Sequence, residues 1–292
     1  MIINQAALAG IYKTFNTLFN EAFDGAPSQW PVVAMEAPVS AKESDYKWLG
    51  AYPMMREWVG DRVIKDLSAF EYAIKNKPFE ATIEVERYDI EYDQIGLYRP
   101  MIQGLAASAK QHPDLLVFAL LLAGWTTQCF DKQYFFDDEH PVGTALISNN
   151  GGGSGTPWFL MDLSRPLKPI ILQIAQRPKF VAMDRPDDEH VFMRNKFRYG
   201  VDDYKNVGFG LWQLAYGSKQ TLDATTYASA RAAMMSFKDE NQVPLGIVPT
   251  HLVVPPTLES AGRKTVVNQR NADGSDNEWY NTAQLVVVPW LA

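Results

Sequence analysis

The sequence predicts an α+β protein, and three patterns lead to that prediction. Apolar and polar residues alternate with a period of two in residues 70–86, which is typical of β-strands. Apolar residues recur every three or four positions in residues 95–111, which indicates a long amphipathic helix. Helical and strand patterns then follow one another in residues 222–288, as in a lobe where helices pack on a sheet.

Composition limits the class of protein. With 292 residues, 47% of them hydrophobic and 21% charged, the chain is long and apolar enough for a large core. A net charge of −7 argues against a general binder of nucleic acid or acidic membranes. The single cysteine, Cys129, excludes an intrachain disulfide and fits a reducing cytoplasm. The longest apolar run, Leu115 to Trp125, is far shorter than the roughly 20 residues of a membrane span. The N-terminus also lacks the features of a secretory signal, so we expect a soluble protein made inside the cell.

The first 45 residues predict an arm with one helix. Residues 1–20 place apolar side chains at helical spacing, after which prolines at three positions break regular structure. These prolines are Pro27, Pro31 and Pro38. Such a segment has few ways to bury its own apolar residues.

Residues 70–86 predict a β-hairpin. Phe70, Tyr72 and Ile74 share one face of the outgoing strand, and residues 79–85 alternate in the same way on the return. Residues 75–78, Lys-Asn-Lys-Pro, are the expected turn. A lone two-stranded ribbon is marginally stable in water, so we expect its apolar face to pack on a neighbouring subunit.

The remaining elements are predicted from local patterns. A long helix over 95–111 should end at His112-Pro113-Asp114, with a second, buried helix over 115–130. Residues 149–155 are rich in glycine and predict a flexible loop, and residues 192–216 predict a β-hairpin around Asp202-Asp203. The last part predicts a helix over 222–240 capped by Asp223 or Thr225, a strand over 247–254, a short helix from Leu258 capped by Thr257, and a strand over 285–288.

No catalytic, cofactor or metal site is predicted. The Asp-Asp-Glu-His tetrapeptide occurs at 137–140 and again at 187–190, and could supply metal ligands, but solvated acidic turns explain both copies better. Gly151–Gly155 lacks the Lys-Ser/Thr pair of a phosphate loop, and 273–278 lacks the full ligand order of an EF-hand. Cys129 is interpreted as an inert core thiol. We therefore expect no enzyme.

Four segments carry a resemblance to a known family. They are MREWVGDR at 55–62, RYDIEYDQ at 87–94, FFDDEHPV at 135–142 and PTHLVVPPTLE at 249–259. Their order over about 200 residues resembles the major head subunit of Mu-like phages and prophages, the gpT family. This resemblance implies a Hong Kong 97-type capsid fold. Its parts would be an N-terminal arm (1–45), an extended β-hairpin loop (46–92), a peripheral domain with a spine helix (93–221) and an axial domain with a return strand (222–292).

The resemblance also implies a function. The chain would self-assemble, as pentamers and hexamers, into an icosahedral shell that encloses double-stranded DNA without sequence-specific binding. It would be a virion protein assembled in the bacterial cytoplasm, with separate scaffold, portal and decoration proteins and no membrane partner. The alternatives are an encapsulin-like compartment and, from a different class, a soluble hydrolase. Particle mass separates the classes, because a shell is a megadalton particle and an enzyme a small oligomer.

The expected self-assembly interface lies on the extended loop. Its aromatic residues suit interface anchors, and the two acids and two arginines around Trp58 could form ion pairs across a subunit boundary. Lys75 and Lys77 at the turn are expected to be solvated rather than cross-linked to a neighbour, because no motif supplies the buried carboxylate base. The predicted interface comprises Trp48, Arg56, Glu57, Trp58, Asp61, Arg62, Phe70, Tyr72, Lys75, Lys77 and Phe79.

Overall fold

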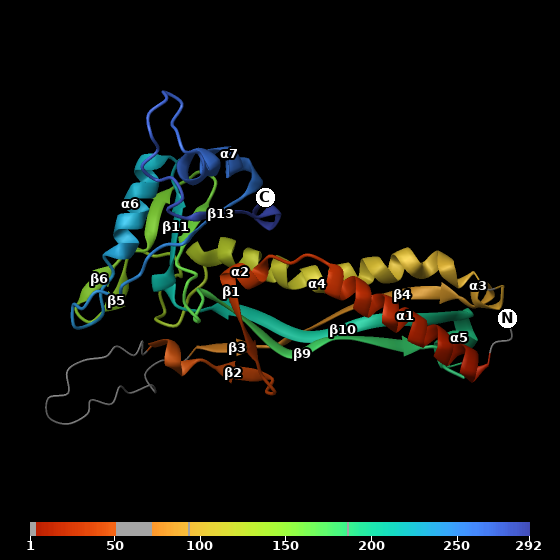
Figure 1. Cartoon of the computed structure of the whole chain (residues 1–292). Coiled ribbons are helices and arrows are strands. Elements are labelled where there is room, and N and C mark those ends of the chain that lie inside the picture. The colour runs from red at the N-terminus through yellow and green to blue at the C-terminus, as the bar shows by residue number, and fades with distance from the viewer. Residues whose placement is uncertain (1–3, 51–71, 93, 186) are drawn as a thin grey trace.

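The computed structural model describes residues 4–50, 72–92, 94–185 and 187–292, and these form two lobes (Figure 1). One lobe is elongated and consists of long strands with two long helices beside them. The other is more compact and contains a second sheet with α6 (Ala224–Met235) and α7 (Glu259–Gly262). Mixed helices and sheets confirm the predicted α+β class. Within the described residues, no helix is both long and apolar enough to cross a membrane.

A four-stranded sheet forms the frame of the elongated lobe. Its order is β1-β9-β10-β4, with β1 parallel to β9 and the other neighbours antiparallel. The bounds are β1 (Ala34–Pro38), β9 (Ile170–Met183), β10 (Lys196–Phe209) and β4 (Lys77–Glu86). The sheet packs with α1 (Gln5–Gly25) and α4 (Arg99–Leu122), and α4 is the spine helix of this lobe.

The helix predicted at the N-terminus is present as α1. Its buried face follows the helical spacing of the sequence, and Asn4 caps it by accepting from the Ala7 N–H at 2.8 Å. This face and one face of α4 enclose a core with residues from β4, β9 and β10. Members of that core include Leu8, Phe15, Ile102, Val85, Phe180 and Tyr199. The arm is therefore partly built into the subunit that carries it.

The predicted hairpin pairing is wrong. β3 (Ala73–Lys75) pairs with β2 (Glu43–Asp45), while β4 pairs along ten residues with β10. Alternation in a sequence identifies a strand but not its partner, and β10 offers β4 a far longer ladder than β3 could. Pro78 is tolerated because β4 is an edge strand. The apolar face of β4 is covered within the subunit, where Val85 is fully buried.

The predicted break at Pro113 is also wrong. α4 continues through His112-Pro113-Asp114 to Leu122 as one helix. Proline in a helix interior removes one hydrogen bond and usually kinks or ends the helix. Here Pro113 and Asp114 are both buried in tertiary contacts, and those contacts outweigh the local preference to stop.

Residues 192–216 do not form a hairpin. The short helix α5 (Glu189–Arg194) precedes β10, which runs without a turn through Asp202-Asp203. The ladder between β9 and β10 changes register between Asp202 and Lys205. A local irregularity thus stands where the sequence predicted the turn.

The compact lobe contains a five-stranded sheet of order β13-β12-β8-β11-β7. Its strands are β13 (Gln284–Val287), β12 (His251–Val254), β8 (Trp158–Met161), β11 (Ala215–Lys219) and β7 (Asn150–Gly153). Three of them, β7, β8 and β11, come from the segment 93–221. The predicted strands at 247–254 and 285–288 are confirmed as β12 and β13. The predicted helix over 222–240 is the shorter α6, and Asp223 caps it in a reciprocal capping box with Thr226.

The glycine-rich segment is not the predicted flexible loop, because Asn150–Gly153 is the edge strand β7. Gly153 has φ of +90°, and a Cβ there would lie 2.5 Å from backbone atoms of Lys219. Only glycine permits both the positive φ and the close approach of the two chains.

Short elements complete the fold. The helical ones are α2 (Trp30–Val33), η1 (Lys47–Gly50), α3 (Arg87–Glu91), η3 (Ile95–Tyr98), η4 (Ala123–Trp125), η5 (Trp212–Leu214), η6 (Pro256–Leu258), the π-helical η7 (Arg263–Val267) and η8 (Pro289–Leu291). The short helix predicted from Leu258 corresponds to η6 followed by α7, but the predicted cap is wrong, because Thr257 lies within η6 and α7 has no side-chain cap. A small ribbon pairs β5 (His140–Val142) with β6 (Ala145–Ile147).

Candidate assembly surfaces

The base of the extended loop is tied to the elongated lobe by buried polar contacts. Gln173 on β9 is fully buried, and its Oε1 accepts from the Tyr46 hydroxyl at 2.8 Å. Its Nε2 donates to the Ile74 carbonyl at 2.9 Å, so one side chain binds both the segment that enters the extended loop, at Tyr46, and the segment that leaves it, at Ile74. The backbone N–H of Tyr46 also donates to the Tyr72 carbonyl at 2.8 Å. The β2–β3 ribbon therefore has a fixed position on β9.

Six of the eleven predicted interface residues lie outside the described residues. These are Arg56, Glu57, Trp58, Asp61, Arg62 and Phe70. Of the other five, Trp48, Lys75 and Lys77 have exposed side chains. Trp48 lies on η1 and makes an edge contact with Tyr46, with 6.4 Å between ring centroids. The Trp48 side chain is 36% exposed.

Tyr72 and Phe79 make contacts within one subunit. The Tyr72 hydroxyl oxygen accepts from the Phe209 N–H at 2.7 Å, and burial raises the pKa of Tyr72 to about 12. The Phe79 ring lies edge-on to the His112 ring at 4.4 Å between centroids. Both aromatic residues thus join the loop base or β4 to other elements of the same chain.

The N-terminal arm is anchored to the middle of the spine helix. Oδ1 of Asp114 accepts from the backbone N–H of Gln29 at 2.9 Å, from the N–H of Trp30 at 2.6 Å and from the Ser28 hydroxyl at 3.1 Å. Burial raises the pKa of Asp114, although the backbone hydrogen bonds oppose that shift. Nothing in the sequence pattern distinguished this aspartate from a helix-ending polar residue.

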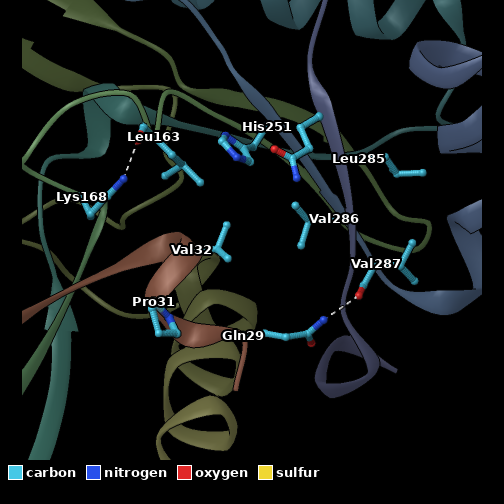
Figure 2. A pocket seen from close by; sticks show the side chains of 10 residues that line it. Gln29, Pro31, Val32, Leu163, Lys168, His251, Leu285, Val286 and Val287 are labelled. Carbon is cyan, nitrogen blue, oxygen red and sulfur yellow. Dashed lines mark hydrogen bonds between the residues drawn. The ribbon is translucent and has the colours of Figure 1, made fainter. Parts of the chain in front are cut away.

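A cavity of about 530 Å³ lies beside this anchor, between α2 and the edge strand β13 (Figure 2). Gln29 donates through Nε2 to the Val287 carbonyl at 3.1 Å, and Lys168 donates through Nζ to the Leu163 carbonyl. Burial and the nearby Lys168 lower the pKa of His251. The Gln29 side chain thus joins the arm to the compact lobe.

The first acidic tetrapeptide is part of a buried network. His140 is fully buried and stacked on Trp212, and its Nδ1 lies 2.7 Å from Oδ2 of Asp131. Cys129 Sγ donates to Oδ1 of Asp131 at 3.0 Å, and His140 Nε2 lies 3.2 Å from Oδ1 of Asn149. Burial would raise the pKa of Asp131, but the hydrogen bond and charge of His140 lower it.

This network makes hydrogen bonds rather than presenting a reactive group. Cys129, Asp131 and His140 form a cluster of three potential metal ligands within the described part of the chain. The hydrogen bonds between them already use the atoms that would bind an ion. Burial also raises the pKa of the Cys129 thiol, which keeps it protonated. Asp137, from the same tetrapeptide, accepts backbone N–H groups of Tyr134, Asp138 and Glu139 and so closes a turn.

Comparison with known proteins identifies the family of this chain. The family model for the Mu-like prophage major head subunit gpT matches residues 8–291. The chain belongs to this family. It is 38% identical over 305 residues to the major capsid protein of Escherichia phage Mu, with all of both chains covered. It is 37% identical over 297 residues to the Mu-like prophage FluMu major head subunit of Haemophilus influenzae, with 96% of each chain covered.

Solved structures agree with the gpT assignment. A chain of the bacteriophage JBD30 procapsid matches with a TM-score of 0.89 at 42% identity, covering 99% of this chain and all of the other. The JBD30 capsid decorated with minor capsid protein trimers matches with a TM-score of 0.79 at 32% identity, covering 91% and 92%. The Hong Kong 97-type capsid fold is therefore confirmed, and the chain is a Mu-like major capsid protein. These comparisons do not favour the encapsulin-like alternative.

Proposed function

We propose that this gpT-family subunit assembles with copies of itself, as pentamers and hexamers, into a closed icosahedral shell that encloses double-stranded DNA. The observation that carries the proposal is the full-length match to a procapsid chain. The net charge of −7 supports an inner surface that holds DNA without binding it tightly or by sequence. Assembly would take place in the bacterial cytoplasm.

The extended loop is the first surface we assign to self-assembly. The β2–β3 ribbon fixes its base on β9 through Gln173, so a neighbour that bound the loop would be linked directly to the frame of the lobe. Trp48, Lys75 and Lys77 are its exposed described members. Arg56, Glu57, Trp58, Asp61, Arg62 and Phe70 remain proposed contacts, whereas Tyr72 and Phe79 are proposed to support the loop from within the subunit.

The domain division is also a proposal. The arm would be residues 1–45, and the peripheral domain would be the four-stranded sheet with the spine helix α4. Membership of the five-stranded sheet supports adding 150–161 and 215–219 to the axial domain that begins, in the sequence-based division, at 222. Pairing of β4 with β10 supports moving 77–86 from the extended loop to the peripheral domain.

Partners other than DNA are proposed from chemistry and relatives. We expect separate scaffold and portal proteins. The decorated JBD30 capsid supports a decoration protein as a further partner. No reaction is assigned to the subunit, since the buried Cys129, Asp131 and His140 bind one another.

Electron microscopy of the purified protein tests this function. The chain would be expressed with and without its neighbouring head genes, and the particle mass would be measured by mass photometry on the same samples. Closed shells of megadalton mass are expected in at least one of the two samples. A monomer or small oligomer in both would contradict the proposal.

A further inference from the structure

The far end of the elongated lobe carries large exposed apolar side chains, among them the most exposed one of the described residues, Phe192. Phe192 is 82% exposed and Met193 is 72% exposed, and both lie on α5. α5 lies with α3 at the end of the lobe opposite the compact lobe (Figure 1). Adjacent exposed aromatic and methionine side chains on a short helix are typical of an interface anchor rather than of a solvated surface.

An apolar groove of about 570 Å³ lies on the same lobe, between α1 and η3. Ile11, Phe15 and Ile95 line its apolar walls. Gly10 and Gly96 also line it, and a Cβ at either would meet nothing within 4 Å, so the groove is open at both glycines. Phe192 and Met193 are not among its lining residues, so the subunit does not fill this groove with its own α5.

The charges beside the two features are complementary. Arg99 lines the groove, and Lys13 is exposed on α1 one residue before the lining residue Thr14. Asp187 and Glu189 are exposed on the N-terminal side of Phe192 and Met193, and Arg194 is exposed on the C-terminal side. An acidic segment before an apolar anchor on one copy would thus meet a groove with apolar walls and a basic rim on another, which favours docking in one orientation.

We propose that α5 of one subunit docks into the α1–η3 groove of a second copy of this chain, with Phe192 as the anchor. The contact is heterologous, because the knob and the groove are different surfaces, and such contacts close into rings when the rotation between copies permits. This inference rests on the proposed shell function and assigns it a second self-assembly surface, independent of the extended loop.

Filling the groove tests the proposal without removing any contact of the subunit. Gly10→Leu adds a side chain where the subunit has free space, and leucine is a better helix former than glycine. We expect an unchanged or higher melting temperature for the unassembled subunit. We also expect an assembly rate roughly tenfold or more below that of the unmodified chain, because the added side chain prevents burial of Phe192 in the groove. Gly25→Leu, at the other end of α1 and also in open space, is the matched control and should assemble normally. Normal assembly of Gly10→Leu would overturn the proposal.

Cysteine pairing identifies the occupant. Thr14→Cys chains and differently tagged Met193→Cys chains would be assembled together and oxidised; the natural Cys129 is buried and should not interfere. We expect disulfide-linked dimers that contain one chain of each kind, and none when Ser275→Cys in the compact lobe replaces Met193→Cys. Intact particles without the mixed dimer, or with only 193–193 dimers, would overturn the docking while leaving the shell function standing. Failure of the unmodified chain to form shells under any condition would overturn both.

Discussion

The carboxylate of Asp114, in the middle of the spine helix, lies 2.6 Å from the backbone nitrogen of Trp30 in the arm. The same oxygen accepts from Gln29 and Ser28. One buried acid thus satisfies the N–H groups at the start of α2, which the helix itself cannot pair. The arm is fixed to α4 at the point where Pro113 weakens the helix.

Replacing Asp114 should loosen the arm. Asp114→Ala leaves two backbone N–H groups and one hydroxyl without their acceptor, and we expect a loss of about 1–3 kcal/mol in the free energy of unfolding. Denaturant unfolding of the unassembled subunit measures it. Asp114→Asn keeps an acceptor oxygen and should lose less. Equal losses for the two variants would show that the hydrogen bonds are not what fixes the arm.

Tyr72 separates a folding role from an assembly role. Tyr72→Phe removes the acceptor of the Phe209 N–H, and we expect a loss of about 1–3 kcal/mol in subunit stability. Tyr204→Phe, at an exposed tyrosine on β10, is the control and should change stability by less than about 0.5 kcal/mol. If Tyr72→Phe unfolds like the control but assembles poorly, Tyr72 belongs to the interface instead.

The pKa of Asp131 predicts a response to acid. Burial alone would raise the pKa of Asp131, but the hydrogen bond and charge of His140 outweigh burial, so the pKa lies below the ordinary value of 3.8. Below pH 3.8 the unfolded chain therefore binds a proton at Asp131 more readily than the folded chain does. The contribution of Asp131 to stability is complete above pH 3.8 and is lost as the pH falls through the pKa of the folded state. Asp131→Asn lacks the contribution, and its stability should fall less steeply with acid, by up to about 1.4 kcal/mol per pH unit. Parallel curves of unfolding free energy against pH for the two proteins would refute this.

The shell should be held together without covalent bonds between subunits. The strand partner of Lys75 is Glu43 on β2, and both side chains are exposed, so this carboxylate is hydrated rather than a buried base. Denaturing gel electrophoresis of mature particles should give a single capsid-protein band near 32.9 kDa. A ladder of multimers would show cross-linking, and substitution of Lys75 or Lys77 would then identify the residue responsible.

Local signals in the sequence predicted local structure well. The buried face of α1 and the cap of α6 depend on residues within one or two turns, and both are confirmed. Pairing depends on distant residues. The alternation in 79–85 identified β4 but could not show that β10, more than 100 residues later, pairs with it. For the same reason the local sequence predicts a turn at Asp202-Asp203, whereas the long pairing with β9 keeps β10 extended there.

The candidate surfaces were harder to predict than the fold. Asp114 is fixed by three donors about 85 residues earlier in the chain, so no local pattern could identify it as an anchor. Phe192 lies on a helix of six residues that is too short to produce a clear period. The four family segments indicated the protein's role, because their order extends over about 200 residues. The groove at Gly10 and Gly96, in contrast, forms only when α1 and η3 lie together in the folded chain.

A cryo-electron microscopy map of particles purified from cells that express the head genes is the most direct test of the central claim that this chain is the repeating unit of a shell. We predict a closed icosahedral particle whose every capsomer is built from the two-lobed fold of Figure 1, with α5 of one copy in the α1–η3 groove of another. A map in which this fold is absent from the shell wall, or in which the purified chain occurs only as a small oligomer, would contradict the account.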